Sequence, residues 1–376
     1  MDFSYSEEQQ AILDLAGQIL DDGTPRERLR ELELGDGPRF DPELWKQVAG
    51  AGLLAIAVPE EYDGAGLGFL EVASVLQQVG ATAAPIPYLE SVVLGALPLA
   101  EFGSGAQKAA WLPRVARGEA VLTAALIEPE GDPLRPSTRA ETDGDGFRLT
   151  GTKFCVPAAE IADAILVTAD TGDGHIGVFL VDPRSEGVRI TPLGTTGGLP
   201  EARVDFERVA APGDAVLGDA QRGRVILEWL LERANAALAA TMLGACEAAL
   251  ELTAEYAKTR KQFDQPIAMF QAVGHRAADA YIDVEGIRLT TLQAVWRISE
   301  GLPAATQVAV AKHWACEAGQ RVVHAAQHLH GGIGVDREYP LHRFFLIVKQ
   351  LELTLGGATQ QLVQLGNLLA DAEDDT

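Results

Sequence analysis

The sequence contains few cysteines and offers no pairing among them. Only three occur in 376 residues, Cys155, Cys246 and Cys316, and they lie far apart. This spacing excludes the paired pattern of a structural zinc site and the framework of a disulfide-stabilised secreted domain. The sequence therefore indicates a reducing compartment, and we expect the protein in the cytoplasm.

Basic residues are also scarce. Thirty Lys and Arg stand against 54 Asp and Glu, which gives a net charge of −24. Such a charge repels nucleic acid and anionic membrane surfaces, so we expect neither as a partner. An anionic ligand would have to be held by local Arg, Lys or backbone N–H groups.

A signal peptide and a long apolar run are missing as well. Residues 1–10 are largely acidic and polar, whereas a signal peptide begins with basic residues and continues with an apolar segment. No uninterrupted apolar run is long enough to cross a bilayer. The 47% hydrophobic content is instead spread along the chain, enough for two or three compact cores.

The periodicity of the apolar residues divides the chain into three parts. Helical spacing predominates in residues 1–120, where turn-forming residues 59–66 interrupt it before it resumes at Phe69. Short β-rich runs fill residues 121–220, and Asp-Gly pairs at 143–146 and Gly-Asp-Gly at 172–174 predict hairpin turns. Residues 221–376 return to helical spacing.

The last part is predicted to be a four-helix bundle. Its four long helical stretches cover residues 222–257, 270–299, 302–328 and 340–370. Consecutive long helices joined by short loops pack as antiparallel neighbours. The alanine-rich run 234–249 predicts a tightly packed, buried helix.

Several motifs follow one another along the chain in a fixed order. They are Leu44-Trp45, Val58-Pro59-Glu60-Glu61-Tyr62, Ile127-Glu128-Pro129, Gly151-Thr152-Lys153, Tyr256 to Phe263, Phe270-Gln271 and Gly331-Gly332-Ile333-Gly334. No single motif is decisive, but their order and spacing together make coincidence improbable. Over nearly its whole length the sequence resembles the acyl-CoA dehydrogenase family, most closely the shorter subunit of two-component actinobacterial members.

The resemblance implies an α+β multidomain fold and a flavin-dependent reaction. Family members join an N-terminal helical domain, a middle β-barrel and a C-terminal four-helix bundle, and they associate as tetramers with FAD where subunits meet. A carboxylate removes the proton beside the thioester carbonyl while the flavin accepts hydride from the next carbon. The implied partners are an acyl-CoA substrate and an electron-transfer flavoprotein as electron acceptor.

The best-matching residues are those that family members present to the FAD of a neighbouring subunit. The resemblance assigns Arg260 to the diphosphate, for which a planar guanidinium is suited. It places the other candidates in the same cleft: Gln262, Phe263, Gln271, Gly331, Gly332 and Gly334. Taken singly, Arg260 could be a helix-end cation and the glycines a helix stop.

The half of the site that would hold the chain's own flavin departs from the family pattern. Cys155-Val156-Pro157 replaces the usual Trp-Ile-Thr, and proline has neither a backbone donor nor a hydroxyl. Only Glu128-Pro129 remains of the family's Glu-Pro-Gly-x-Gly-Ser-Asp run.

The catalytic base is not identified. The usual glutamate position reads Gly356, and the alternative position on the first bundle helix falls near Ala234. Glu352 lies one predicted helical turn before Gly356 and would share its face. Glu247, near Gly244 on the first bundle helix, is another candidate, and Glu232 is predicted to point away because two residues rotate a helix by about 200°.

Two histidines also have a spacing that can chelate a metal. His324 and His328 are four residues apart on a predicted helix, but no acidic partner is in register, so no metal site is predicted. His328 and His330 are instead expected to line the cofactor or subunit contact beside the glycine turn.

These observations leave three hypotheses. The first is a partner subunit of a heterotetramer in which a second chain supplies the base and flavin pocket, with bulky, steroid-like acyl-CoA substrates. The second is a self-sufficient homotetramer with a displaced base, and the third a scaffold subunit without flavin.

Overall fold

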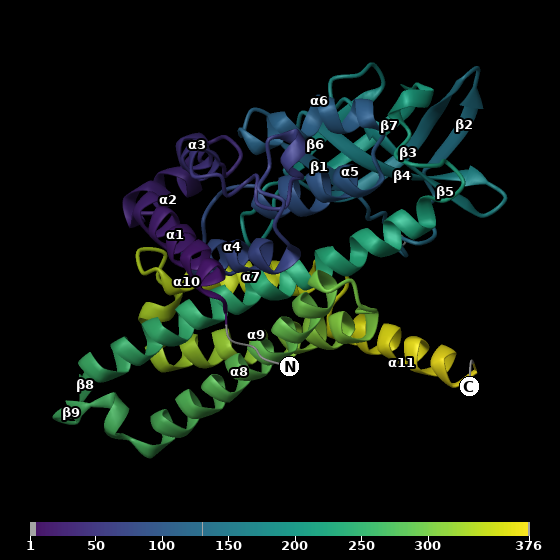
Figure 1. Cartoon of the computed structure of the whole chain (residues 1–376). Helices are drawn as coiled ribbons and strands as arrows, with labels where there is room; N and C mark the ends of the chain where they lie inside the picture. The colour runs from purple at the N-terminus through teal and green to yellow at the C-terminus, as the bar shows by residue number, and fades with distance from the viewer. Residues whose placement is uncertain (1–4, 130, 375–376) are drawn as a thin grey trace.

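The computed structural model describes residues 5–129 and 131–374, which form helices, then a sheet, then a second set of helices (Figure 1). Helix α1 begins with a capping box, in which Ser6 Oγ accepts from the Gln9 N–H at 3.2 Å. The predicted return of helix at Phe69 is confirmed. The N-terminal elements are α1 (Glu7–Gly23), α2 (Arg26–Leu34), α3 (Pro42–Gly50), η1 (Glu60–Tyr62), α4 (Phe69–Thr82), the π-helix η2 (Leu89–Ala96), α5 (Leu97–Phe102) and α6 (Gly105–Ala116).

The middle part is a curled seven-stranded sheet with the order β1-β4-β2-β3-β7-β6, and β5 pairs with β4. Both predicted hairpins are present: Asp143 pairs with Gly146, and Gly172 with His175. Gly144 and Gly174 adopt the positive φ that these turns require. The strands are β1 (Leu122–Ala125), β2 (Arg139–Asp143), β3 (Gly146–Pro157), β4 (Ala164–Gly172), β5 (His175–Val181), β6 (Val188–Leu193) and β7 (Glu201–Ala211).

The C-terminal helices are longer and pack side by side. They are α7 (Gly223–Thr259), α8 (Gln271–Ser299), α9 (Ala305–His330), α10 (Leu341–Leu353) and α11 (Ala358–Asp374), with a small hairpin β8 (Lys261–Gln262) and β9 (Gln265–Pro266) between α7 and α8. The hairpin lies at the far tip of the bundle (Figure 1). The helical, sheet, helical fold predicted from the sequence is confirmed.

The fourth helical stretch is not one helix. The sequence predicts a continuous helix over 340–370, but α10 ends at Leu353 and α11 begins at Ala358. Leu355 and Gly356 have φ angles of 56° and 98°, which a right-handed helix cannot contain. The premise that placed Glu352 on the same helix face as Gly356 is therefore wrong.

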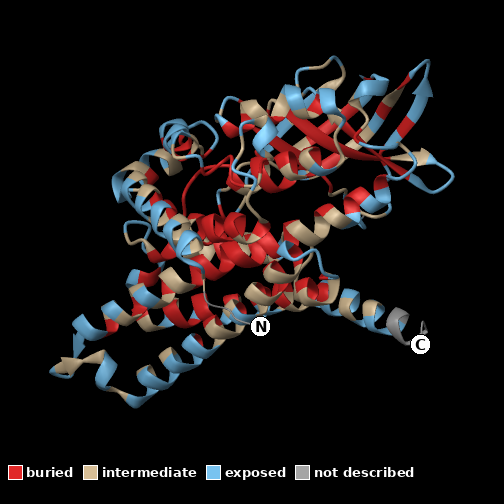
Figure 2. Ribbon diagram, in the orientation of Figure 1, coloured by how far each residue is buried: buried red, intermediate tan, exposed pale blue. Residues whose placement is uncertain are grey.

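Helix α7 is the centre of the largest core cluster. Its alanine-rich stretch is buried, as predicted, and the red band in Figure 2 follows it where α4 crosses. An apolar window in α7 is long enough to span a membrane, but 72% of it is buried inside the protein, as in the core helix of a bundle.

Glycines allow α4 and α7 to approach closely. A Cβ on Gly244 would lie 1.7 Å from the Gln77 carbonyl oxygen, and one on Gly80 would lie 1.9 Å from the Thr241 oxygen. Gly244 lies in the middle of α7, within the helix predicted over 222–257. Only glycine fits because a helix backbone passes over it.

Candidate functional site

A cavity of about 1170 Å³, called here the large cavity, lies where the three parts of the chain meet. Its walls come from α4, η2, α7, the sheet and the α10–α11 break. Most lining side chains are apolar, including Leu76, Leu126, Leu238 and Leu351. Large apolar cavities with a few polar groups are the usual form of a small-molecule site.

The break between α10 and α11 forms part of this wall. Leu355, Gly356 and Thr359 line the cavity, and Gly356 is the residue that the sequence resemblance assigns to the position of the usual base. Helix α9 holds the break from behind: the fully buried Lys312 Nζ donates to the Leu351 carbonyl at 2.5 Å, and Cys316 donates to that of Glu352. These contacts satisfy carbonyls that the end of a helix leaves without partners.

The three glutamates considered as substitute bases do not line the large cavity. The Glu352 carboxylate accepts from Lys349 Nζ at 2.7 Å and is only 14% exposed. Glu247 is held by Arg288 at 2.6 Å and by the Gln77 amide at 2.7 Å. Glu232 lies beside Arg233 at 3.5 Å.

A different glutamate, Glu90 in η2, does line the large cavity. Its pKa is raised to about 7, chiefly by burial; a backbone hydrogen bond opposes this shift and the negative charge of Glu201 adds to it. A carboxyl group with such a pKa can exchange a proton near neutral pH. Sequence reasoning missed Glu90, although a single acid within the apolar run 86–99 was a usable signal.

The retained Glu128 and Lys153 form a buried ion pair rather than a surface turn. Lys153 has no exposed side-chain area, and its Nζ lies 2.7 Å from Glu128 Oε1. Burial alone would raise the pKa of Glu128, but Lys153, Ser137 and Thr138 lower it to about 2. The pair joins the loop after β1 to strand β3.

The strand residues that line the large cavity show whether this chain can bind the isoalloxazine ring of a flavin by itself. Pro157 lacks an N–H group, and the other polar lining groups among these strand residues are the Cys155 thiol and the Glu201 carboxylate. A carboxylate there opposes the negative charge that a flavin acquires on reduction. These residues do not supply the donors that would hold an isoalloxazine ring.

The predicted diphosphate-binding residues lie together at the tip of the bundle. Arg260 follows α7, Gln262 lies in β8, Phe263 in the hairpin turn, and Gln271 begins α8; we call these four the tip cluster. All are exposed, and the Phe263 side chain is 86% exposed. Within the described part of the chain, Arg260 makes no side-chain hydrogen bond or ion pair. An exposed guanidinium beside an aromatic ring fits an anionic ligand from outside this chain.

The glycine turn lies at the same end of the bundle as the tip cluster. Gly331, Gly332 and Gly334 belong to the 3-10 helix η5 (Gly331–Val335), and the first two are exposed. Tyr256 connects the two regions because its ring stacks on His330, which directly precedes this turn, with 4.3 Å between ring centroids.

The three histidines singled out in the sequence, His324, His328 and His330, differ in their contacts and in their exposure. His330 is buried, with Nδ1 2.8 Å from the Ala326 carbonyl and Nε2 3.1 Å from the Tyr339 hydroxyl, so the expectation that it lines a contact surface is wrong. His324 packs edge-on against Phe345, while His328 is exposed. Among the described residues, no group of three His, Cys, Asp or Glu is arranged to hold a metal.

Comparison with known proteins gives matches along the whole chain. Residues 6–119, 127–209 and 221–367 match the family models described as acyl-CoA dehydrogenase N-terminal, middle and C-terminal domains. The chain is 43% identical to acyl-CoA dehydrogenase FadE27 of Mycobacterium tuberculosis, covering 99% of both chains.

Two solved structures are similar throughout. A chain of the ChsE4-ChsE5 complex from Mycobacterium tuberculosis has a TM-score of 0.93 and 44% identity, with 98% of this chain and 99% of that chain covered. A variant of the Tcur3481-Tcur3483 steroid ACAD has a TM-score of 0.92 and 42% identity, with the same coverage.

Proposed function

Because this chain belongs to the acyl-CoA dehydrogenase family, we propose that it is the partner subunit of an FAD-containing heterotetramer that dehydrogenates acyl-CoA thioesters. Membership makes it part of an oxidoreductase acting on CH–CH groups, and members of the family are FAD-dependent. Bound FAD supplies the hydride acceptor for this reaction. The proton acceptor in this proposal comes from the second subunit.

One observation carries the proposal: the chain presents ligand-binding groups outward, and inward it has glycine at the position that the resemblance assigns to the family's base. Arg260 and Phe263 are exposed at the bundle tip, where they can reach a cofactor held by another chain. Gly356, which the sequence resemblance assigns to the position of the family's carboxylate, lines the large cavity. A subunit built for its own flavin would need both halves.

The substrate in this proposal is a bulky acyl-CoA, such as one with a steroid side chain. The name of the similar Tcur3481-Tcur3483 steroid ACAD supports a steroid substrate, and the similar ChsE4-ChsE5 complex supports an assembly of two different subunits. The large cavity and the small residues Gly356 and Gly357 leave room for a wide substrate. An electron-transfer flavoprotein as acceptor and a cytoplasmic location complete the proposal.

The experiment replaces Arg260 in the assembled complex with its presumed second subunit. Arg260→Ala should lower the FAD content and weaken FAD binding by about tenfold or more, because a charge-assisted diphosphate contact is lost. Arg260→Lys should retain part of the binding. Arg208→Ala, an exposed arginine on β7, is the control. Unchanged FAD binding in Arg260→Ala would contradict the assignment.

Glu90 gives the self-sufficient alternative a specific form. It places a carboxyl group with a pKa of about 7 in the cavity wall, which none of Glu352, Glu247 and Glu232 does. If the chain alone is yellow and acyl-CoA bleaches it, Glu90→Gln should abolish bleaching. A colourless chain that stays colourless with its partner would favour the flavin-free scaffold.

A further inference from the structure

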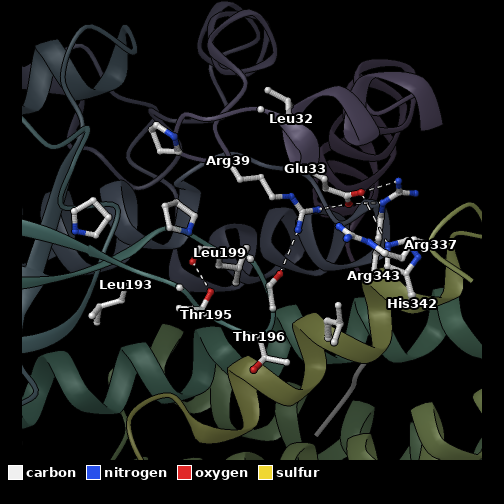
Figure 3. A pocket seen from close by; sticks show the side chains of 18 of the residues that line it. Leu32, Glu33, Arg39, Leu193, Thr195, Thr196, Leu199, Arg337, His342 and Arg343 are labelled. Carbon is white, nitrogen blue, oxygen red and sulfur yellow. Dashed lines mark hydrogen bonds and ion pairs between the residues drawn. The ribbon is translucent and has the colours of Figure 1, made fainter. Parts of the chain in front are cut away.

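A second cavity, of about 760 Å³, borders the same loop 194–200 as the large cavity. We call it the arginine cavity. Figure 3 shows that its charged side chains come from α2, the segment after α2, and the region around the start of α10. They are Glu33, Arg39, Arg337, His342 and Arg343, and the exposed Asp36 and Glu160 also line the cavity.

The Arg39 guanidinium is buried without adequate partners. Its side chain is 7% exposed, and its best hydrogen bond is a 3.4 Å contact from Nη1 to the Gly197 carbonyl. Nε and Nη2 have no hydrogen-bond partner, although Nη2 lies 3.4 Å from a Glu33 oxygen. Buried N–H donors without acceptors lower the stability of the folded protein. A bound ligand that accepts hydrogen bonds from Nε and Nη2 would remove this cost.

The nearby carboxylate is already used by another arginine. Glu33 accepts from Arg343 Nε at 2.6 Å and from its Nη2 at 3.1 Å, and Arg343 is also buried. Two buried guanidinium groups thus share one largely buried carboxylate, which leaves one excess positive charge among the buried groups. Such a charge stands out in a chain with a net charge of −24. The exposed lining residues Asp36, Glu160 and Arg337 lie in water and screen one another.

The rest of the arginine cavity suits a ligand with an apolar body. Leu32, Leu199, Phe345 and Leu346 contribute to its walls, and the Thr196 side chain lines it from loop 194–200 (Figure 3). Arg337 lies exposed among the lining residues.

We propose that the arginine cavity binds a small organic carboxylate, with Arg39 as its principal contact and the apolar walls around its hydrocarbon part. One excess buried cation matches one monoanionic group, and a planar guanidinium matches a carboxylate. Arg39, Glu33 and Arg343 line this cavity and not the large cavity, although the two cavities share loop 194–200.

The test uses calorimetric titration of the full chain, in complex with its partner where they co-purify, with octanoate as the probe. Octanoate should bind to the wild type, and Arg39→Met should weaken binding by at least about tenfold. Arg39→Lys should restore part of the affinity, and Arg208→Met, on the surface, should leave it unchanged. Thermal unfolding shows that each variant is folded.

Three outcomes would overturn the proposal. Equal affinity of the wild type for octanol would show that the charge plays no part. Equal octanoate affinity in folded Arg39→Met would place the ligand elsewhere, for example in the large cavity. Preference for inorganic phosphate over octanoate would assign the cavity to phosphate groups instead.

Discussion

At the residue scale, the ion pair of Glu128 and Lys153 explains why these two residues match the family pattern. The neighbouring residues Cys155 and Pro157 do not match it. Both members of the pair are buried, and Glu128 also accepts hydrogen bonds from the Ser137 and Thr138 N–H groups. Their role in this chain is to fix the loop after β1. Sequence reasoning placed the motif correctly but could not see the pair, because the two residues are 25 positions apart.

Removing one member of this pair should destabilise the protein strongly. Glu128→Gln leaves the Lys153 cation buried, and we expect a loss of about 3–5 kcal/mol in the free energy of unfolding. Glu128→Leu combined with Lys153→Met should recover much of it. The control, Glu141→Gln, breaks an exposed pair and should cost less than about 1 kcal/mol. Denaturant unfolding measures all four proteins, and a Glu128→Gln cost as small as the control would contradict the assignment.

The same pair has a defined pH dependence. The pKa of Glu128 is lowered from 4.5 to about 2, so its stabilisation is complete above pH 4.5 and is lost as the pH falls towards 2. Unfolding curves of wild type and Glu128→Gln should therefore converge over this interval. Parallel curves would show that the carboxylate charge is not involved.

Glu90 should have the opposite pH dependence. Its pKa is raised from 4.5 to about 7, so the folded protein holds a proton that the unfolded chain releases, and stability falls as the pH rises from 4.5 to 7. Glu90→Gln should be more stable than wild type at pH 8 by roughly 1–3 kcal/mol, and similar at pH 5. Equal pH slopes for the two proteins in denaturant unfolding would contradict this.

At the scale of elements, the crossing of α4 and α7 depends on glycines. Gly244→Ala would place a methyl group 1.7 Å from the Gln77 carbonyl oxygen, so we expect a destabilisation of about 2–3 kcal/mol. Gly366→Ala is the matched control, because it lies in exposed α11 with no atom near its added Cβ, and it should stabilise by about 0.5–1 kcal/mol. Thermal unfolding compares them, and effects of the same sign would contradict the packing argument.

The elements also show how far the sequence could predict the fold. Periodicity located α4, α7 and α8, and Asp-Gly turns located the hairpins, because these signals are local. The break at Leu355 and Gly356 was missed because apolar spacing continues across it, and the contacts from Lys312 and Cys316 that hold it are tertiary. For the same reason Glu352 was assigned to the wrong face.

At the scale of the whole molecule, the candidate site divides into an outward half and an inward half. The sequence motifs predicted the members of the tip cluster, and the fold brings Arg260, Gln262, Phe263 and Gln271 together at one exposed end. Their role towards FAD stays a prediction. The isolated acid in the apolar run 86–99 marks Glu90 in the sequence, but the cavity that it faces and the arginine cavity could not be predicted, because residues far apart in sequence form them.

The most direct test of the shared-site proposal is the flavin absorbance of the purified chain, alone and after assembly with its presumed partner subunit. The proposal predicts a colourless chain alone and a yellow complex whose flavin is bleached by an acyl-CoA. A single chain that is yellow and bleached by an acyl-CoA would contradict it.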